Sequence, residues 1–105
     1  MAQFYIKAGD TSPNLDVRLI DPNGNAVSLT GSTVTFTMKD QFGTTTINAA
    51  ATTFIDAANG KVRYTWVTGN TSTTGDYTGF FKVTFSGGQI ETFPNFGTFQ
   101  IQIVS

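Results

Sequence analysis

The sequence has 105 residues, a length that suits one domain spanning residues 1–105 and allows burial of a sizeable hydrophobic core. It contains no His and no Cys, which excludes His-based general-base chemistry, thiolate nucleophiles and disulfide bonds. Seven acidic residues against six basic ones give a formal net charge of -1, so we expect no long-range electrostatic attraction to nucleic acid or anionic lipid.

The first third of the chain predicts short extended segments separated by turns. Residues 4–7 form a first extended segment, and the polar run 8–14, with Gly9 and Pro13, favours a loop. From residue 15 to residue 20 apolar and polar residues alternate, until the tetrapeptide Asp-Pro-Asn-Gly at 21–24 predicts a tight turn. Residues 25–29 then return as the second strand of a hairpin.

The middle of the chain holds the clearest alternation and the weakest. Residues 32–39 place Val34, Phe36 and Met38 on one face and Thr or Lys on the other, as in a strand with one wet face. A turn at 40–43 follows. Residues 44–47 and 49–55 are weakly patterned, and their Ala and Thr content also permits a short helical turn. The dipeptide Asn59-Gly60 then predicts a hairpin.

The last third is organised around the stretch GDYTGFFKVTF at 75–85, which we interpret as the central strand. Tyr77 lies two residues after a glycine, the position where Greek-key sandwiches place a tyrosine whose hydroxyl bonds nearby backbone. The loop 68–74 precedes this strand, and Gly87-Gly88 predicts a hairpin after it. Residues 90–93 return before Pro94, and residues 98–104 form the last strand.

The number and spacing of these segments indicate the fold class. Seven to nine short strands with frequent turn signals and no helical period predict an all-β, antiparallel immunoglobulin-like β-sandwich, with a barrel as the alternative. The faces of the strands predict the buried core. It comprises Val34, Phe36, Met38, Tyr64, Trp66, Tyr77, Phe81, Val83, Phe85, Phe99 and Ile101.

The remaining polar residues do not form a pattern typical of an active site. Three of the six Asp residues stand directly beside Gly or Pro, and Asp40 begins the predicted turn at 40–43, where Asp is favoured for local backbone hydrogen bonds. We therefore predict no catalytic pair, no metal site and no cofactor. The first residues lack the features of a signal peptide and no stretch approaches 18 apolar residues, so we expect no membrane partner and no secretory export.

A few apolar residues are harder to bury. Phe80 lies opposite the core face of the central strand, Phe42 lies in a turn, and Phe93 and Phe96 flank an interruption at Pro94. These rings either cap the end of the sandwich or serve as docking points for another subunit. Together with the loop at residues 9–13 they supply the candidate interface residues. These are Asp10, Thr11, Pro13, Phe42, Phe80, Phe93, Pro94 and Phe96.

A series of segments, in order and spacing, also carries a family resemblance. The segments are IKAGDTSP (6–13), LID (19–21), VSLTG (27–31), VTFTM (34–38), GKVRYTW (60–66), GDY (75–77), FKVTF (81–85) and ETFP (91–94). In these segments the chain resembles the N-terminal domain of phage baseplate upper proteins, which is similar to a small immunoglobulin-like domain that anchors a receptor-binding apparatus to the phage tail.

This resemblance implies a non-enzymatic virion protein in the tail baseplate or a tail-associated ring. Its expected partners are other virion proteins and further copies of itself, as a trimer or larger ring. In the family the domain is followed by linking segments, whereas this sequence ends at Ser105. A standalone adaptor and a capsid decoration protein therefore stay open as alternatives. The aromatic rings that are harder to bury keep open an alternative of another class, a carbohydrate-binding module that holds host-surface glycan.

Overall fold

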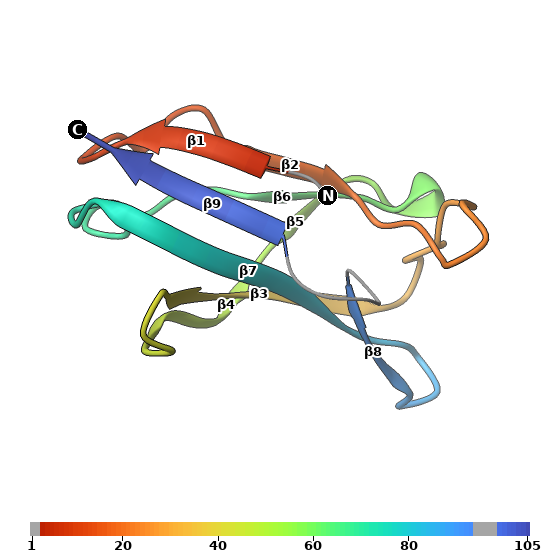
Figure 1. The fold of residues 1–105 in the computed structure, drawn as a ribbon. Helices are drawn as coiled ribbons and strands as arrows, with labels where there is room; N and C mark the ends of the chain where they lie inside the picture. Colours follow the sequence, from red (N-terminus) through yellow and green to blue (C-terminus); the bar gives the residue numbers. More distant parts are fainter. Residues whose placement is uncertain (1–2, 94–98) are drawn as a thin grey trace.

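The computed structural model describes residues 3–93 and 99–105 and is built almost entirely of strands (Figure 1). In these residues one 3-10 turn, η1 (Ala57–Asn59), accompanies the strands. The strands are β1 (Gln3–Lys7), β2 (Leu15–Arg18), β3 (Thr33–Asp40), β4 (Thr45–Ala51), β5 (Thr53–Asp56), β6 (Lys61–Tyr64), β7 (Gly75–Thr84), β8 (Ile90–Phe93) and β9 (Phe99–Val104).

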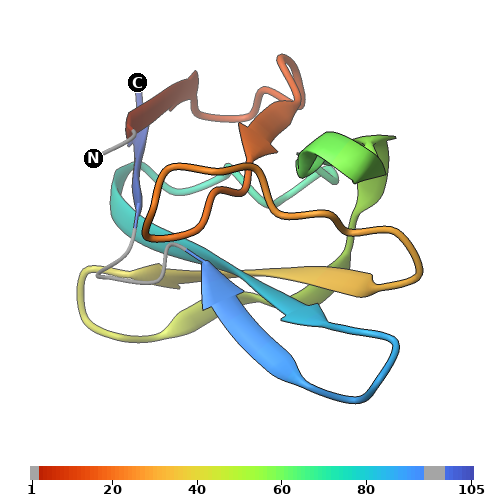
Figure 2. The same cartoon turned by 90° about the vertical axis from the view of Figure 1, so that its right-hand side faces the viewer.

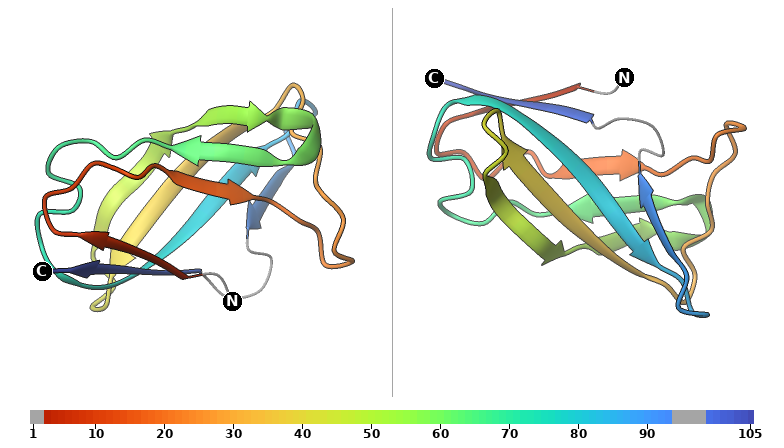
Figure 3. Two further views of the ribbon diagram at one scale, coloured as in Figure 1. Left: turned by 90° about the horizontal axis from the view of Figure 1, so that it is seen from above. Right: turned by 60° about the horizontal axis from the view of Figure 1, so that its bottom comes forward.

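The strands form two stacked sheets. The larger sheet has the order β1-β9-β7-β3-β4, with β8 also paired to β7, and the smaller sheet has the order β2-β6-β5. Viewed from above, the smaller sheet lies across the larger one (Figure 3, left). The architecture is therefore the predicted β-sandwich and not a barrel. One pairing departs from the antiparallel prediction, because β1 runs parallel to β9.

Strand β7 is the centre of the larger sheet. It pairs with β3 from Tyr77 to Thr84. Its other edge pairs with β9 over its first half and with β8 over its second half. Its burial alternates, with Tyr77, Phe81 and Val83 inward. The Tyr77 hydroxyl donates a 2.7 Å hydrogen bond to the carbonyl oxygen of Thr73, so the predicted tyrosine corner is confirmed.

Aromatic rings from both sheets fill the space between them. The Phe36 ring packs 4.8 Å from Tyr64 and 5.0 Å from Phe81, measured between ring centroids, and Trp66 meets Tyr64 edge-on at 5.3 Å. Of the expected core residues Phe85 is only half-buried, and the side chain of Phe99 lies outside the described residues. The other nine are buried. They are Val34, Phe36, Met38, Tyr64, Trp66, Tyr77, Phe81, Val83 and Ile101.

The predicted hairpin after residue 24 forms only in part. The turn is present, since the Gly24 N–H donates to the carbonyl oxygen of Asp21, but residues 25–29 make a single bridge, Ile20 to Ala26, and no strand. The prediction of a strand there is wrong because Leu29 is fully buried and its N–H donates to Ala57 of η1. Residues 25–29 thus lie at the end of the sandwich, beside η1, and are held there by the Leu29–Ala57 hydrogen bond (Figure 2).

The weakly patterned region resolves into two strands and a turn. β4 and β5 occupy residues 45–51 and 53–56, and the short helical turn falls just beyond them at η1. The β5–β6 hairpin is closed by η1 and by Gly60, whose φ is 73°. A Cβ at Gly60 would lie 2.6 Å from the carbonyl oxygen of Leu19, so only glycine fits this close backbone approach.

Candidate protein-interaction surfaces

The sheet edges are the first candidate surfaces, since an edge strand presents backbone N–H and C=O groups that can pair with another chain. β1 and β4 end the main strand order of the larger sheet, and β2 and β5 flank the smaller one. Natural edges are usually protected by charge, by bulges or by shortness. β8, which pairs with β7 off this order, is a further edge strand, with four residues and a charge at Glu91. The other four edges differ in their protection.

The β2 edge is protected by charge. The Asp16 carboxylate accepts two hydrogen bonds from the Arg63 guanidinium, at 2.8 and 3.1 Å, and Arg18 lies opposite Lys61. The Arg63 hydrogen bonds hold the pKa of Asp16 below its ordinary value, against a smaller opposing effect of burial. The same hydrogen bond raises the pKa of Arg63. An uncharged strand that paired here would have to displace solvated charges.

The β4 and β5 edges carry no charge until Asp56 but are irregular. Along β4 the register against β3 shifts twice, between Lys39 and Met38 and between Met38 and Phe36, and β5 shifts once against β6. Ala49 adopts a left-handed φ of 48°, and its N–H donates to the Thr37 hydroxyl instead of a ladder carbonyl. These β-bulges twist the edge and interrupt the row of free backbone groups.

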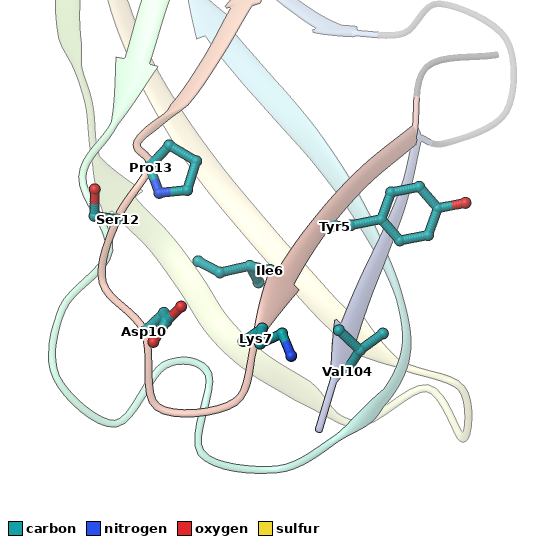
Figure 4. A pocket seen from close by; sticks show the side chains of 7 residues that line it. All are labelled: Tyr5, Ile6, Lys7, Asp10, Ser12, Pro13 and Val104. Atoms are coloured by element: carbon teal, nitrogen blue, oxygen red, sulfur yellow. The ribbon is translucent and has the colours of Figure 1, made fainter.

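In the described residues the β1 edge is the least protected of the four. Its register against β9 is unbroken from Gln3 opposite Gln100 to Lys7 opposite Val104, and its only charge is at Lys7. Beside it lies a hollow of about 290 Å³ (Figure 4). The hollow is lined by Tyr5, Ile6, Lys7, Asp10, Ser12, Pro13 and Val104. Three consecutive residues of β1 contribute, so the backbone edge of the strand itself borders the hollow.

The loop after β1 contains three of the expected interface residues. Asp10, Thr11 and Pro13 are all exposed, and two of them, Asp10 and Pro13, line the hollow. In Figure 4 the Ile6 side chain extends from β1 toward Pro13 across the hollow. The structure therefore brings part of the expected loop surface together with the free edge of β1.

The expected aromatic docking points are scattered. Phe42, at the tip of the β3–β4 turn, is 83% exposed, whereas Phe80 is half-buried on the outer face of β7. Phe93 is 1% exposed, so its ring belongs to the core of the sandwich, as in the first of the two interpretations kept open for it above. It lies directly opposite Phe81 on the antiparallel β7–β8 pair, and directly opposed residues face the same side, here the core. Pro94 and Phe96 lie outside the described residues.

Two buried tyrosines are the other titratable groups with shifted pKa values. Burial raises the pKa of Tyr64, whose hydroxyl donates a 2.7 Å hydrogen bond to Asn70. Burial, and then the Asp40 carboxylate, raise the pKa of Tyr77. A raised folded-state pKa means that each tyrosine contributes stability below its ordinary pKa of about 10, which is lost as pH rises through the folded value.

Within residues 3–93 and 99–105 no group of three or more His, Cys, Asp or Glu side chains is placed to hold a metal ion. In the same part of the chain no helix has the length and apolar character needed to cross a membrane.

Sequence reasoning missed the most open of these surfaces. Tyr5 and the unprotected β1 edge were not among the expected interface residues, and the Asp16–Arg63 ion pair was not foreseen. A local signal for β1 exists, because residues 3–6 are an uncharged extended segment without Pro or Gly. What the sequence does not reveal is that this segment lies at an edge.

The fold and these surfaces together define a β-sandwich with exposed strand edges and loops. The model of the BppU N-terminal domain, the N-terminal domain of the baseplate upper protein, matches residues 2–103. The chain therefore belongs to this family of phage baseplate structural domains, and the resemblance seen in the sequence is confirmed.

Two further comparisons were made. The solved structure of CopC from Methylosinus trichosporium OB3b is similar to the chain with a TM-score of 0.55 and 15% sequence identity, covering 99% of this chain and 85% of that one. At this identity the similarity concerns the β-sandwich fold alone. The comparison with curated proteins found no match.

Proposed function

We propose that this chain is a non-enzymatic adaptor of the phage tail baseplate, or of a ring associated with it, and connects receptor-binding parts to the particle by protein-protein contacts. Several copies assemble together in the particle as a trimer or a larger ring. The single observation that carries the proposal is the family match, which spans residues 2–103 and hence nearly the whole chain.

The surface of the sandwich supports a contact role. The unprotected β1 edge, the exposed loop residues Asp10, Thr11 and Pro13, and the protruding Phe42 offer backbone groups, polar side chains and an apolar anchor to partners. Edges and loops of this kind are common elements of protein interfaces. Low charge, with a formal net charge of -1, suits close contacts between copies that would otherwise repel one another.

The proposal is tested by immunogold electron microscopy of purified particles, with an antibody raised against this chain and preimmune serum as the control. Gold at the tail end is the expected result, and cross-linking mass spectrometry of the same particles then identifies the neighbours. Gold around the head would instead assign the chain to capsid decoration. An unlabelled particle, with the protein expressed and its epitope accessible, would reject the virion role and make binding to a host-glycan array the next measurement.

A further inference from the structure

The free edge of β1 is the starting point. Among the four outer edges compared above, β2 is charged and β4 and β5 are bulged, whereas β1 is regular and uncharged from Gln3 to Ile6. An edge without charge, bulge or Pro is a surface on which another strand can pair. The regular β1 edge is therefore the place where we expect a partner strand to pair.

The backbone groups that face outward on β1 follow from its pairing. The Ala8 N–H donates to the Val104 carbonyl oxygen at 2.7 Å, so Ala8 faces β9. Backbone groups alternate in direction along a strand, so Ile6 also faces β9 whereas Tyr5 and Lys7 face away. The Lys7 carbonyl oxygen accepts the Asp10 N–H at 3.0 Å. This leaves the N–H and C=O of Tyr5 and the N–H of Lys7 directed to the outside.

We propose that the free edge of β1 pairs with the same edge of a second copy of this chain, antiparallel and about a two-fold axis at Tyr5. In this register Tyr5 lies opposite Tyr5 of the second copy and exchanges two backbone hydrogen bonds with it. The Lys7 N–H of each copy donates to the Gln3 carbonyl oxygen of the other. The two larger sheets then become one continuous sheet with their core faces on the same side.

The second copy is favoured over another partner because the strand is complementary to itself. A two-fold axis at Tyr5 places the only charged residue of the strand, Lys7, opposite the uncharged Gln3, so no like charges are opposed. Tyr5 is 55% exposed and would form a cross-strand aromatic pair at the centre. A strand added here also covers the border of the hollow, including its apolar residues Ile6 and Pro13.

The inference narrows the proposed assembly to the larger ring, because a trimer cannot satisfy a two-fold contact in every copy, and it does not depend on the baseplate role. A two-fold contact joins copies in pairs, so a ring that uses it contains an even number of copies. The contact is tested on purified protein, whereas the baseplate role is tested on particles. Gold on phage heads would reject the baseplate role and leave the β1 pairing standing. A purified protein that stays monomeric would reject the β1 pairing and leave the baseplate role standing.

The test is sedimentation equilibrium of the purified chain at concentrations up to about 1 mM, the range in which weak contacts are detected. The wild type is expected to be in monomer–dimer equilibrium. Tyr5→Glu and Tyr5→Lys each place like charges opposite one another at the axis and should weaken the dimer about tenfold or more. An equimolar mixture of the two variants should recover dimers, because the axis then joins Glu to Lys.

Three controls separate the contact from general effects. Tyr5→Thr keeps an uncharged strand-forming residue and should retain the dimer. Thr84→Glu adds a charge at an exposed position of β7, away from β1, and should not change the dimer affinity. Tyr5→Pro removes the outward N–H without breaking the ladder with β9 and should abolish the dimer. Urea unfolding of every variant verifies that it is folded.

Four results would overturn the inference. They are a wild type that remains monomeric up to about 1 mM, a trimer or other odd-numbered species, a dimer unaffected by Tyr5→Glu in the folded protein, and a mixture of charge variants that fails to recover dimers. The last result is specific to the register, since only a contact with Tyr5 opposite itself predicts recovery.

Discussion

The two lateral sides of this sandwich differ in how their exposed strand edges are protected from pairing with other strands. On one side β4 and β5 end the two sheets with strands whose single charge is Asp56, and bulges at three places disrupt their edges. On the other side β2 is regular and carries Asp16 of the Asp16–Arg63 pair, while its neighbour β1 is regular and uncharged from Gln3 to Ile6. The difference teaches that an edge is open to a partner strand only when it is both regular and largely uncharged, as β1 is.

The first prediction concerns Trp66, which holds the β1 side in place through its ring stacked on Phe4, 5.9 Å between centroids. Trp66 is buried, so Trp66→Ala should cost about 3–5 kcal/mol of unfolding free energy through the cavity it leaves. Urea denaturation measures the loss. Among the described residues Trp66 Nε1 is the one buried side-chain nitrogen or oxygen without a hydrogen-bond partner, so Trp66→Phe should cost clearly less. Equal losses for both would contradict this account.

The second prediction concerns Gly60, which closes the β5–β6 hairpin and lies against the backbone of Leu19. Gly60→Ala should cost about 2–4 kcal/mol, because it combines a left-handed φ with a Cβ 2.6 Å from a carbonyl oxygen. Gly43→Ala is the matched control. It has a similar φ of 87° but open space around the added Cβ, so it should cost about 1 kcal/mol. Thermal unfolding that ranks Gly43→Ala as the worse variant would refute the close-packing argument.

The third prediction uses Tyr77, which lies on β7 between the two sides and serves as a reference. Tyr77→Phe should lose the 2.7 Å bond to Thr73 and cost about 0.5–1.5 kcal/mol in urea denaturation. It should leave the association of β1 edges unchanged. Tyr5→Phe removes an exposed hydroxyl and should stay within about 0.5 kcal/mol of wild type. A Tyr77→Phe variant as stable as wild type would show that the corner bond contributes nothing.

The fourth prediction tests the bulged edge directly. Ala49 has a left-handed φ of 48°, so Ala49→Gly should relieve strain and raise the unfolding free energy by about 0.5 kcal/mol. Ala51→Gly, in the same strand but without a positive φ, should lower it by about 0.5–1 kcal/mol. Opposite signs for these two glycines, in one denaturation series, would verify the bulge, and losses of equal size would contradict it.

The smallest effect is expected at the charged edge. Asp16→Asn removes an exposed ion pair and should lower stability only slightly. Because the folded-state pKa of Asp16 is depressed, the pair contributes above its ordinary value of 3.8, and the difference from wild type should vanish as pH falls through the folded value. Asp76→Asn, which removes an exposed carboxylate on β7 outside this ion pair, is the control. Added salt should shrink the Asp16 effect, and a difference that grows at low pH would exclude this explanation.

Strands whose faces differ in polarity were predictable from the sequence. Residues 33–40 and 75–84 alternate because one side meets the core and the other meets water, and local period alone reports this. The tyrosine corner was likewise encoded locally, by Tyr77 shortly after Gly75. The composition of residues 44–55 gave no such contrast, because β4 and β5 are edge strands that remain largely exposed on both faces.

The features that the sequence did not yield depend on contacts between distant segments. Nothing local indicates that β1 pairs with β9 in parallel, or that Phe93 is carried into the core by its position opposite Phe81. Residues 25–29 look like a strand until Leu29 is seen to bind Ala57. The candidate interface was therefore predicted only in its loop, at Asp10 and Pro13, since edge status belongs to the assembled sheet.

The parallel pairing of β1 with β9 also governs the order of folding. Gln3 pairs with Gln100, so during synthesis β1 has no ladder partner until β9, far along the sequence, has also been made. The closure of so long a loop contributes to a high contact order and slows the final docking step. During synthesis β1 thus has two unpaired edges instead of one, and it is most exposed to wrong pairing before β9 has been made.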